Sequence, residues 1–329
     1  MYKQFYQLRR NPFEITPDPS FLFPTKRHNE ALAALYYGVR RNKGFVVMTG
    51  EVGTGKTLLV RCLLELLRRA EVGFAYIFNP RLSPLEFLRY IARDLGLQVA
   101  GKAKDELLLD LGAYLIDRHR KKLTTVLVVD EAHHLAADVL EEIRLLTNLE
   151  TSQDKLLQIL LVGQPELDEK LDSMELRQLK QRVALRCHLE PLGPQETADY
   201  VRRRLQVAGA TEADSQTIFG DASIAKIHLH SRGIPRLINT ICENALINGY
   251  AKQLNRIPPE MIEEVAGDLR LSVVHPTRPD RDENREEVQK ALRMLLGLQQ
   301  YLQGSRLQDE EHLVGTVRGV RVRDDEPII

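Results

Sequence analysis

The sequence predicts an α/β fold in which a parallel five-stranded sheet is sandwiched by helices and followed by a small all-α domain. Five short apolar segments alternate with longer amphipathic ones between residues 44 and 190, as in strand–helix–strand crossover units. The apolar segments do not alternate with polar residues, which indicates strands covered on both faces. After Pro191 only helical periodicity remains, so the sheet is expected to end there.

The expected elements follow in order from the spacing of the apolar residues. Residues 1–43 are an entry segment, rich in proline and aromatic residues up to Pro24 and helical over 28–41. Strands are predicted at 45–48, 74–78, 125–129, 157–162 and 184–189, and helices between them at 57–69, 84–95, 105–120, 138–149 and 166–179. A helical domain over 191–270 is predicted to contain helices at 195–207, 221–230, 236–251 and 259–269. The last segment, 271–329, is predicted to be a charged linker, a short amphipathic helix at 287–303 and a flexible tail.

The bulk composition argues against several classes of protein. With 46 basic and 46 acidic residues, the chain has no overall attraction to nucleic acid or to an anionic membrane, although a local basic patch remains possible. Cys62, Cys187 and Cys242 match no metal-ligand spacing and indicate reduced thiols. The N-terminus has no signal-peptide core, and no apolar run approaches the ~18 residues of a spanning helix. We therefore expect a cytoplasmic protein without a membrane span.

A phosphate-binding loop is predicted where the first strand ends and the next helix begins. Its residues are Gly50, Glu51, Val52, Gly53, Thr54, Gly55, Lys56 and Thr57, and Leu58 completes the expected nucleotide-binding set. In this context the glycines let backbone N–H groups surround phosphates, which the helix N-terminus also attracts. Lys56 would bind the β- and γ-phosphates, and the Thr57 hydroxyl would bind Mg²⁺. A glycine-rich turn with a surface lysine is the alternative, which the strand–loop–helix context disfavours.

Two adjacent acids, Asp130 and Glu131, end the apolar segment that begins at Thr125. This is the pattern of a Walker B strand. The carboxyl ends of parallel strands meet at one edge of a sheet, so the acids should lie near the phosphate-binding loop. Asp130 would hold Mg²⁺ and Glu131 would activate the attacking water as a catalytic base. The alternative is a pair of carboxylates on a solvated turn.

The expected nucleotide is ATP, with Mg²⁺, and the expected acceptor is water. The guanine-reading Asn/Thr-Lys-x-Asp motif is absent, since Asn42-Lys43 is followed by Gly44-Phe45. Small-molecule kinases share the phosphate loop but usually lack the Asp–Glu pair. The sequence Asp-Glu-Ala-His at 130–133 occurs in some helicases, but no other helicase motif is visible. His133 and the next histidine are expected to cap or pack rather than to bind a metal.

Several blocks of this sequence, in this order, resemble the ExeA-type AAA+ ATPases, the family of general secretion pathway protein A. The blocks are Phe5-Tyr6, Asn11-Pro12-Phe13, Thr16-Pro17-Asp18-Pro19, His28 to Gly38, Thr49 to Thr57, Asp130 to His133, Leu145 to Glu150, Leu161 to Leu167 and Gly233-Ile234-Pro235-Arg236. The resemblance covers about residues 1–270. It implies an AAA+ nucleotide-binding core over 44–190, a helical lid over 191–270 and an N-terminal segment, 1–43, that caps the nucleotide site.

The resemblance also implies roles for residues that spacing alone leaves open. Gln164 is similar to sensor 1, which reads the γ-phosphate and the water, with a turn residue as the alternative. Arg236 is similar to sensor 2, at a helix start where the helix dipole disfavours a cation. Arg182, or Arg177 instead, would be an arginine finger for a neighbouring subunit, which implies a homo-oligomer; a solvated basic helix end is the alternative. Asn79 is similar to a residue that restrains the catalytic glutamate.

The function implied by the resemblance is that of a motor or switch ATPase acting on a protein partner in envelope export or assembly. The secretion ATPases of this family carry a membrane span and a peptidoglycan-binding domain after the lid, where this sequence has a charged linker and a short apolar heptad pattern. It is therefore more similar to members associated with exosortase, exopolysaccharide or pilus gene sets.

Two other functions stay open. Transposition-helper ATPases, which handle DNA, share this core, and Arg202-Arg203-Arg204 could contact phosphates, although a charged helix face explains that run equally well. A nucleotide-gated scaffold with little turnover is the second alternative.

Overall fold

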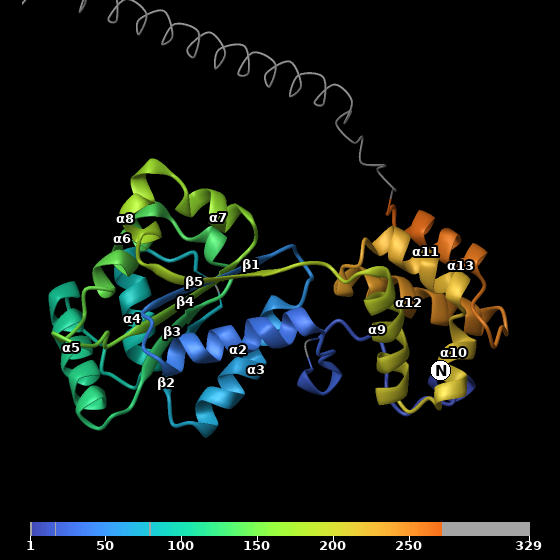
Figure 1. The fold of residues 1–329 in the computed structure, drawn as a ribbon, viewed down its shortest axis with the longest axis horizontal. Helices are drawn as coiled ribbons and strands as arrows, with labels where there is room; N and C mark the ends of the chain where they lie inside the picture. The colour runs from blue at the N-terminus through green and yellow to red at the C-terminus, as the bar shows by residue number, and fades with distance from the viewer. Residues whose placement is uncertain (1, 17, 79, 272–329) are drawn as a thin grey trace, which may run out of the picture. The chain divides into compact units, whose positions relative to one another are not determined.

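The computed structural model describes residues 2–16, 18–78 and 80–271. At its centre is a sheet in the order β2-β3-β4-β1-β5, in which every adjacent pair of strands is parallel (Figure 1). The strands are β1 (Phe45–Gly50), β2 (Gly73–Ile77), β3 (Thr125–Val129), β4 (Gln158–Gly163) and β5 (Val183–Leu189). The predicted parallel five-stranded sheet is confirmed, and all strand bounds lie within two residues of the predicted ones.

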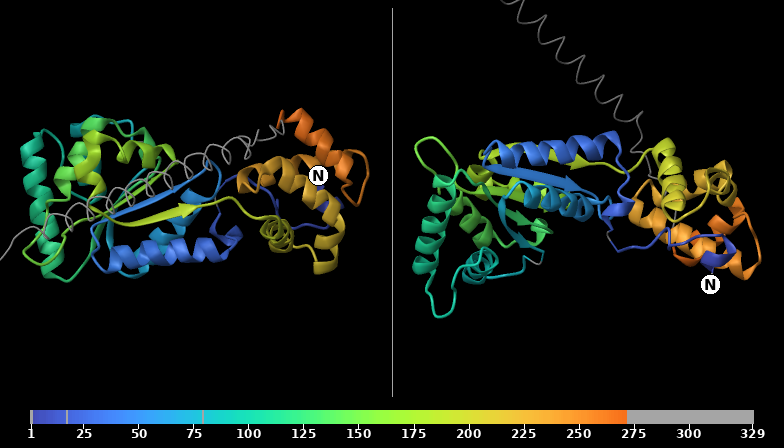
Figure 2. Two further views of the ribbon diagram at one scale, coloured as in Figure 1. Left: turned by 45° about the horizontal axis from the view of Figure 1, so that its top comes forward. Right: turned by 90° about the horizontal axis from the view of Figure 1, so that it is seen from below.

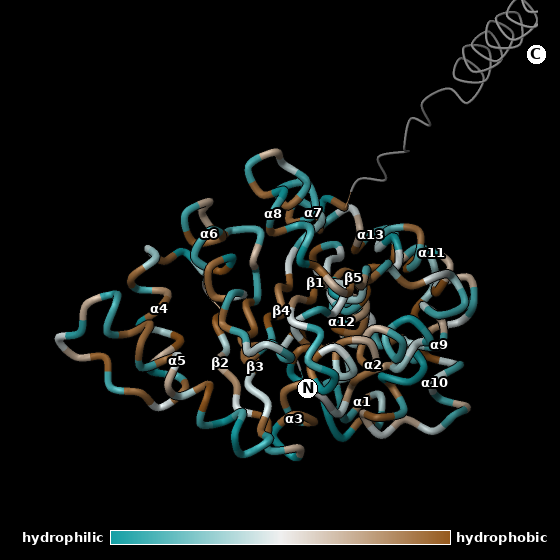
Figure 3. Tube along the Cα trace, turned by 60° about the vertical axis from the view of Figure 1, so that its left-hand side comes forward, coloured by the Kyte–Doolittle hydropathy of each residue, from teal (hydrophilic) through white to brown (hydrophobic). Residues whose placement is uncertain are grey.

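Helices cover both faces of the sheet (Figures 1 and 2). On one face lie α2 (Lys26–Arg40) and α3 (Lys56–Arg69), which pack on each other and on β1. On the other face lie α4 (Pro84–Asp94), α5 (Lys104–Arg120) and α6 (Ala137–Leu146). Along these outer helices hydrophobic and hydrophilic stretches alternate, as expected where one side of each helix is buried (Figure 3).

Successive strand residues belong to two different apolar cores. In β1, Val46 and Met48 pack in the core under α2 and α3, whereas Phe45 and Val47 pack in the core under α4, α5 and α6. All six residues of β1 are buried. A strand with two buried faces needs apolar residues throughout, which explains the absence of polar alternation in the sequence.

The helical domain contains α9 (Pro194–Val207), α10 (Glu212–Ile218), α11 (Asp221–Ser231), α12 (Pro235–Ala251) and α13 (Pro259–Asp268). The N-terminal helix α1 (Tyr2–Phe5) packs on α12. Tyr2, Tyr6 and Phe13 are buried in the same apolar cluster as Ile238 and Ile241 of that helix. The first residues of the chain therefore belong to the core of the helical domain, although the whole sheet domain separates them in sequence from α9.

Three features of the helices differ from the predictions. The predicted helix at 166–179 is three short pieces, α7 (Glu166–Leu171), η3 (Met174–Leu176) and α8 (Arg177–Lys180). Ser173 is extended there, with φ −62° and ψ 152°, and Asp172 forms an ion pair with Lys180 that holds the turn. Short polar side chains compete with the helix in this way. Helix α10 was not predicted because only Ser215 and Ile218 of its seven residues are buried, which leaves no apolar periodicity. Two further 3-10 turns, η1 (Pro19–Phe21) and η2 (Ala132–His134), were also not predicted.

No helix among the described residues is both long enough and apolar enough to cross a membrane. The predicted helix at 287–303 and Asn79 lie outside the described residues.

Candidate nucleotide site

The loop at residues 51–55 joins β1 to α3 at the carboxyl edge of the sheet. Gly53 and Gly55 have φ values of +83° and +102°, which L side chains rarely adopt. A Cβ atom at Gly50 would lie 2.6 Å from the carbonyl oxygen of Leu189. The glycines of the motif are therefore required by the backbone path, which curls its N–H groups toward the start of α3 in a cradle suited to phosphate oxygens.

Lys56 is buried at the first position of α3. Its Nζ donates to the carbonyl oxygens of Gly50 and Glu51 at 2.7 and 2.8 Å. Burial lowers the pKa of Lys56, and the carboxylates of Glu131 and Asp130 oppose that shift. The ammonium is thus held against the backbone of the phosphate loop.

Thr57 and Asp130 meet across the end of the sheet. The Thr57 hydroxyl donates to Asp130 Oδ2 at 2.9 Å, and the Tyr76 hydroxyl donates to the same oxygen at 3.2 Å. Burial raises the pKa of Asp130, whereas the hydrogen bonds from Thr57, the Glu131 backbone and Tyr76 lower it. A hydroxyl and a carboxylate in contact beside a phosphate cradle form the oxygen donor set that Mg²⁺ prefers, so the residues present fit this ion.

Glu131 follows Asp130 in a left-handed backbone conformation, with φ 53° and ψ 34°. Its side chain is 41% exposed, and Oε2 lies 3.5 Å from His133 Nε2. The His133 ring also contacts Gln164, whose amide nitrogen lies 2.9 Å from Nε2 and whose backbone nitrogen lies 3.4 Å from Nδ1. The carboxylate expected to act as base and the amide expected to act as sensor 1 therefore share one buried imidazole.

The same turn contains a group of side chains that could hold a metal ion. Ligand atoms of Glu131, His133 and His134 all lie within 4.8 Å of one another. However, His133 already contacts Gln164, and burial together with the neighbouring His134 lowers the pKa of its ring. These contacts favour a neutral imidazole that orients Glu131 and Gln164 over an imidazole that binds a metal ion. A packing role is also what the sequence predicts for this histidine.

The helical domain contributes Arg236, at the first turn of α12. Its backbone N–H donates to the carbonyl oxygen of Gly53 at 3.2 Å, and its side chain is exposed toward the loop. Gly233 precedes it with φ +73°, and a Cβ atom there would lie 1.9 Å from the Leu192 carbonyl oxygen. Arg236 is thus brought to the phosphate end of the site by a turn that only glycine can form.

A cavity of about 460 Å³ extends from the loop between the sheet domain and the helical domain. Val52, Gly53, Gly55, Lys56, Thr57, Leu58, Glu131, Gln164 and Arg236, all predicted site residues, line it. Of the other predicted residues, Gly50, Glu51 and Thr54 shape the loop and Asp130 lies behind Thr57.

Arg182 is not part of this site within one chain. It precedes β5, at the amino edge of the sheet, and its guanidinium donates to Asn148 Oδ1 at 2.7 Å and to the Thr147 hydroxyl. Arg177 is exposed on α8, and its side chain forms no hydrogen bond or ion pair with the described residues.

Several residues of the site were not predicted from the sequence. His28 is buried with Nε2 3.3 Å from the Thr54 carbonyl oxygen and Nδ1 2.7 Å from the Thr25 hydroxyl, so it supports the loop from behind. Arg204 is buried in the cavity wall, where it donates to the carbonyl oxygens of Pro12 and Glu14. No local pattern signals these contacts, since each joins segments that are distant in sequence.

Residues 39–171 match the sequence model of the AAA domain family. Over 273 residues, or 83% of the chain, the sequence is 46% identical to general secretion pathway protein A of Aeromonas hydrophila. The match covers 48% of that protein, so the chain spans about half its length.

The fold is similar to that of solved structures with much lower sequence identity. The ORC2 protein of Aeropyrum pernix has a TM-score of 0.58 and 17% identity, with 78% of this chain and 71% of that chain covered. The RuvB Holliday junction branch migration motor of Thermotoga maritima has a TM-score of 0.51 and 19% identity, with 79% and 74% covered.

The parallel sheet, the phosphate loop and the helical C-terminal region define an AAA+ ATPase. Within that class the chain belongs with the ExeA-type ATPases, because its sequence relationship to general secretion pathway protein A extends well beyond the AAA domain. The resemblance inferred from the sequence blocks is confirmed.

Proposed function

We propose that the chain is a Mg²⁺-dependent, ATP-hydrolysing switch that works in envelope export or assembly. The observation that carries the chemistry is the Thr57–Asp130 contact of 2.9 Å, with Lys56 on one side of it and Glu131 on the other. A phosphate-binding lysine, a Mg²⁺ donor pair and a half-exposed carboxylate base at one cavity are the parts needed to hydrolyse a phosphoanhydride.

In the proposed reaction the loop N–H groups and Lys56 bind the β- and γ-phosphates of ATP. Bound Mg²⁺ supplies charge neutralisation on the phosphate oxygens. Glu131 accepts a proton from the attacking water, while Gln164 donates to the γ-phosphate or to that water. Arg236 approaches the phosphates from the helical domain, so the occupancy of the site would set the position of that domain.

The complete site is proposed to form between two copies of the chain. Arg182 lies on the opposite edge of the sheet from its own loop, where it could reach only the nucleotide of a neighbour. An oligomer with Arg182, or Arg177, as a finger in trans would then couple hydrolysis to subunit contacts. The sequence relationship to a protein named for general secretion supports a protein partner in an export system, of the secretion, exopolysaccharide or pilus type. Because the proposed function uses ATP, we propose that the chain works on the cytoplasmic side of the membrane.

DNA handling finds less support in the residues named for it. Arg202 pairs with Asp221 at 2.7 Å, and Arg204 is buried, so only Arg203 of the three arginines is exposed and unpaired. The run does not form a basic face on α9.

The test compares Glu131→Gln with Lys56→Ala in the full chain. Glu131→Gln should bind ATP with near-parental affinity and lose turnover by about 10²–10⁴-fold, as expected for loss of a general base. Lys56→Ala should lose ATP binding itself. The Glu131→Gln protein, held in ATP, should then capture a partner from a lysate that the Lys56→Ala protein does not capture. A parental protein without turnover would support the scaffold instead, and DNA-stimulated hydrolysis with a steep salt dependence would contradict the export role.

A further inference from the structure

The amino edge of the sheet, on the side away from the phosphate loop, gathers four connections of the sheet domain. They are residues 40–43 before β1, 68–73 leading into β2, 117–124 before β3 and 150–155 before β4. Since the strands are parallel, each connection reaches the same edge. We call these four segments the amino-edge face.

Two observations confirm that the four segments lie together. Asn42, Arg120, Lys122 and Lys155, from three of them, line one cavity of about 450 Å³. Arg118 donates to the Glu71 carbonyl oxygen at 3.0 Å and thereby joins the remaining segment to the others. The amino-edge face is therefore one continuous surface.

This face is strongly basic in a chain whose net charge is zero. The four segments contain ten lysines and arginines and four carboxylates. Among the described residues, Arg40, Arg41, Arg69, Arg120 and Lys122 are all exposed and form no ion pair. Two of the four carboxylates already pair with a cation, Asp117 with Lys121 and Glu150 with Lys155. The five exposed cations named above therefore form no ion pair with the carboxylates of the face.

Helix dipoles explain only part of this charge. Cations are favoured in the last turn of a helix, and α2, α3 and α5 all end at this edge. Yet α12 and α13 carry no basic residue in their last turns. Lys43, Lys122 and Lys155 also lie outside the helices altogether. The concentration of charge thus exceeds what helix termini require.

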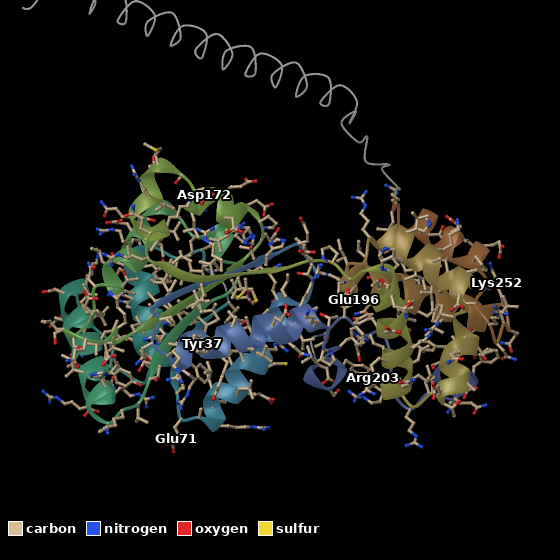
Figure 4. The ribbon with its side chains drawn as sticks, in the orientation of Figure 1. Tyr37, Glu71, Asp172, Glu196, Arg203 and Lys252 are labelled. Atoms are coloured by element: carbon tan, nitrogen blue, oxygen red, sulfur yellow. The ribbon has the colours of Figure 1, made fainter. Side chains whose placement is uncertain are left out.

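Exposed apolar side chains accompany the cations. Tyr37 is 50% exposed on α2, Leu66 38% on α3 and Ile116 43% on α5. Each lies three or four residues before an unpaired arginine, namely Arg40, Arg69 or Arg120, and so shares a helix side with it. Figure 4 shows Tyr37 and Glu71 at the ends of α2 and α3 that approach this edge. The three apolar side chains thus adjoin the amino-edge face, two on α2 and α3 on one side of the sheet and one on α5 on the other.

We propose that the amino-edge face binds the surface of a membrane that contains anionic lipids. The unpaired cations would bind the phosphate headgroups, and the apolar side chains would insert at the boundary between the headgroups and the acyl chains. Nucleic acid also has phosphates for the cations and bases that could stack on Tyr37, but it has no apolar region in which Leu66 and Ile116 could be buried. The apolar component therefore favours lipid. This surface lies outside the nucleotide site, so binding would not require ATP.

The test is co-sedimentation of the full chain with vesicles, without nucleotide. Vesicles of phosphatidylcholine with phosphatidylglycerol should bind the protein, and vesicles of phosphatidylcholine alone should not. Replacing Arg40, Arg41, Arg120 and Lys122 by Gln should weaken binding by about 10²–10³-fold, because each such side chain near an anionic surface contributes about five-fold. Raising the ionic strength from about 0.1 M to about 1 M should release the parental protein, since it shortens the screening length from about 10 Å to about 3 Å.

A matched variant separates this surface from charge in general. It replaces four exposed cations elsewhere, Lys26, Arg93, Arg203 and Lys252, by Gln and should bind as the parental protein does. Equal loss in both variants, or no binding to anionic vesicles, would overturn the proposal. Leu66→Asn with Ile116→Asn should weaken vesicle binding and leave any duplex-DNA binding unchanged. Tighter binding to duplex DNA than to vesicles, unaffected by these two changes, would assign the face to nucleic acid instead. Basal ATP hydrolysis, measured without vesicles, reports separately on the proposed function.

Discussion

The backbone N–H of Arg236 donates to the carbonyl oxygen of Gly53 at 3.2 Å, which ties the first turn of a helix in the helical domain to the phosphate loop. Gly53 has φ +83°, and a Cβ atom on it would lie 2.6 Å from the Cβ atom of Arg236. The absence of a side chain at this position therefore serves two ends: it permits the loop conformation and it lets α12 approach.

Gly53→Ala should consequently separate the two domains at this contact. The left-handed conformation costs an L residue about 1–2 kcal/mol, and the contact with Arg236 adds to that strain. Because displacement of a positioned group by about 1 Å can cost 10²-fold in rate, we expect turnover to fall by ~10-fold or more. Steady-state hydrolysis and titration with a fluorescent ATP analogue measure the effect. Gly112→Ala in α5, where no atom lies within 4 Å of the new Cβ, is the matched control and should keep parental turnover.

His133 is expected to act as a positioning residue for hydrolysis. Its ring lies 3.5 Å from the Glu131 carboxylate and 2.9 Å from the Gln164 amide, so His133→Ala should free both side chains. We expect turnover to fall by roughly 10–10²-fold while the ATP dissociation constant changes little, since neither the loop nor Lys56 is touched. His119→Ala, at the opposite edge of the sheet, serves as the control. Equal losses in the two variants would show that the contacts of His133 have no special importance.

Arg182 and Arg177 can be distinguished by mixing variants. Arg182→Ala should lose ~10³-fold or more in turnover if its guanidinium completes a neighbouring site, whereas Arg177→Ala should lose little. Mixing Arg182→Ala with Lys56→Ala should restore activity, because an oligomer then contains sites with an intact loop from one subunit and an intact arginine from the next. Arg182 also donates to Asn148, so thermal unfolding of each variant must be measured alongside. Absence of recovery in a stable mixture would rule out action in trans.

The stability of the protein should depend on the protonation of His28. Burial lowers the pKa of His28 below its ordinary value of 6.5, so the unfolded chain binds this proton more readily than the folded chain. The corresponding stability is present above pH 6.5 and is lost as the pH falls from there toward the folded-state pKa. One such group changes the free energy of unfolding by at most about 1.4 kcal/mol per pH unit.

Urea denaturation between neutral and mildly acidic pH measures this slope. His28→Asn should be less stable than the parental protein at neutral pH, where the contacts with Thr25 and the loop are lost, but its stability should fall less steeply on acidification. A slope for His28→Asn equal to the parental one would contradict the assignment.

The sheet and the centre of the site could be predicted because their signals are local. Strands β1 to β4 are mainly apolar segments, Asp130 and Glu131 directly follow β3, and Lys56 and Thr57 begin the helix that follows β1 and its loop. Parallel strands alone bring these residues to one edge. No assumption about packing was needed.

The remainder depends on contacts between distant segments. Tyr76, His28 and Arg204 reach the site through hydrogen bonds over 26 to 192 residues of sequence, which no periodicity reveals. The interruption at Asp172 and Ser173 depends on an ion pair with Lys180 after the turn. The basic amino-edge face could not be predicted from the sequence either, because its charges are spread over four segments of a chain with no net charge.

The N-terminal residues buried in the helical domain have a mechanical consequence. The backbone leaves that domain after Phe13, enters the sheet domain at α2, and returns to the helical domain between β5 and α9. The two domains are thus connected by two separate lengths of chain, near residues 14–25 and 190–193. A body held at one point can swing in any direction, whereas a body held at two points turns freely only about the line through them. The second connection accordingly limits how far the two domains can separate, and cutting the chain within residues 14–25 would remove that limit while leaving every phosphate-binding residue in place.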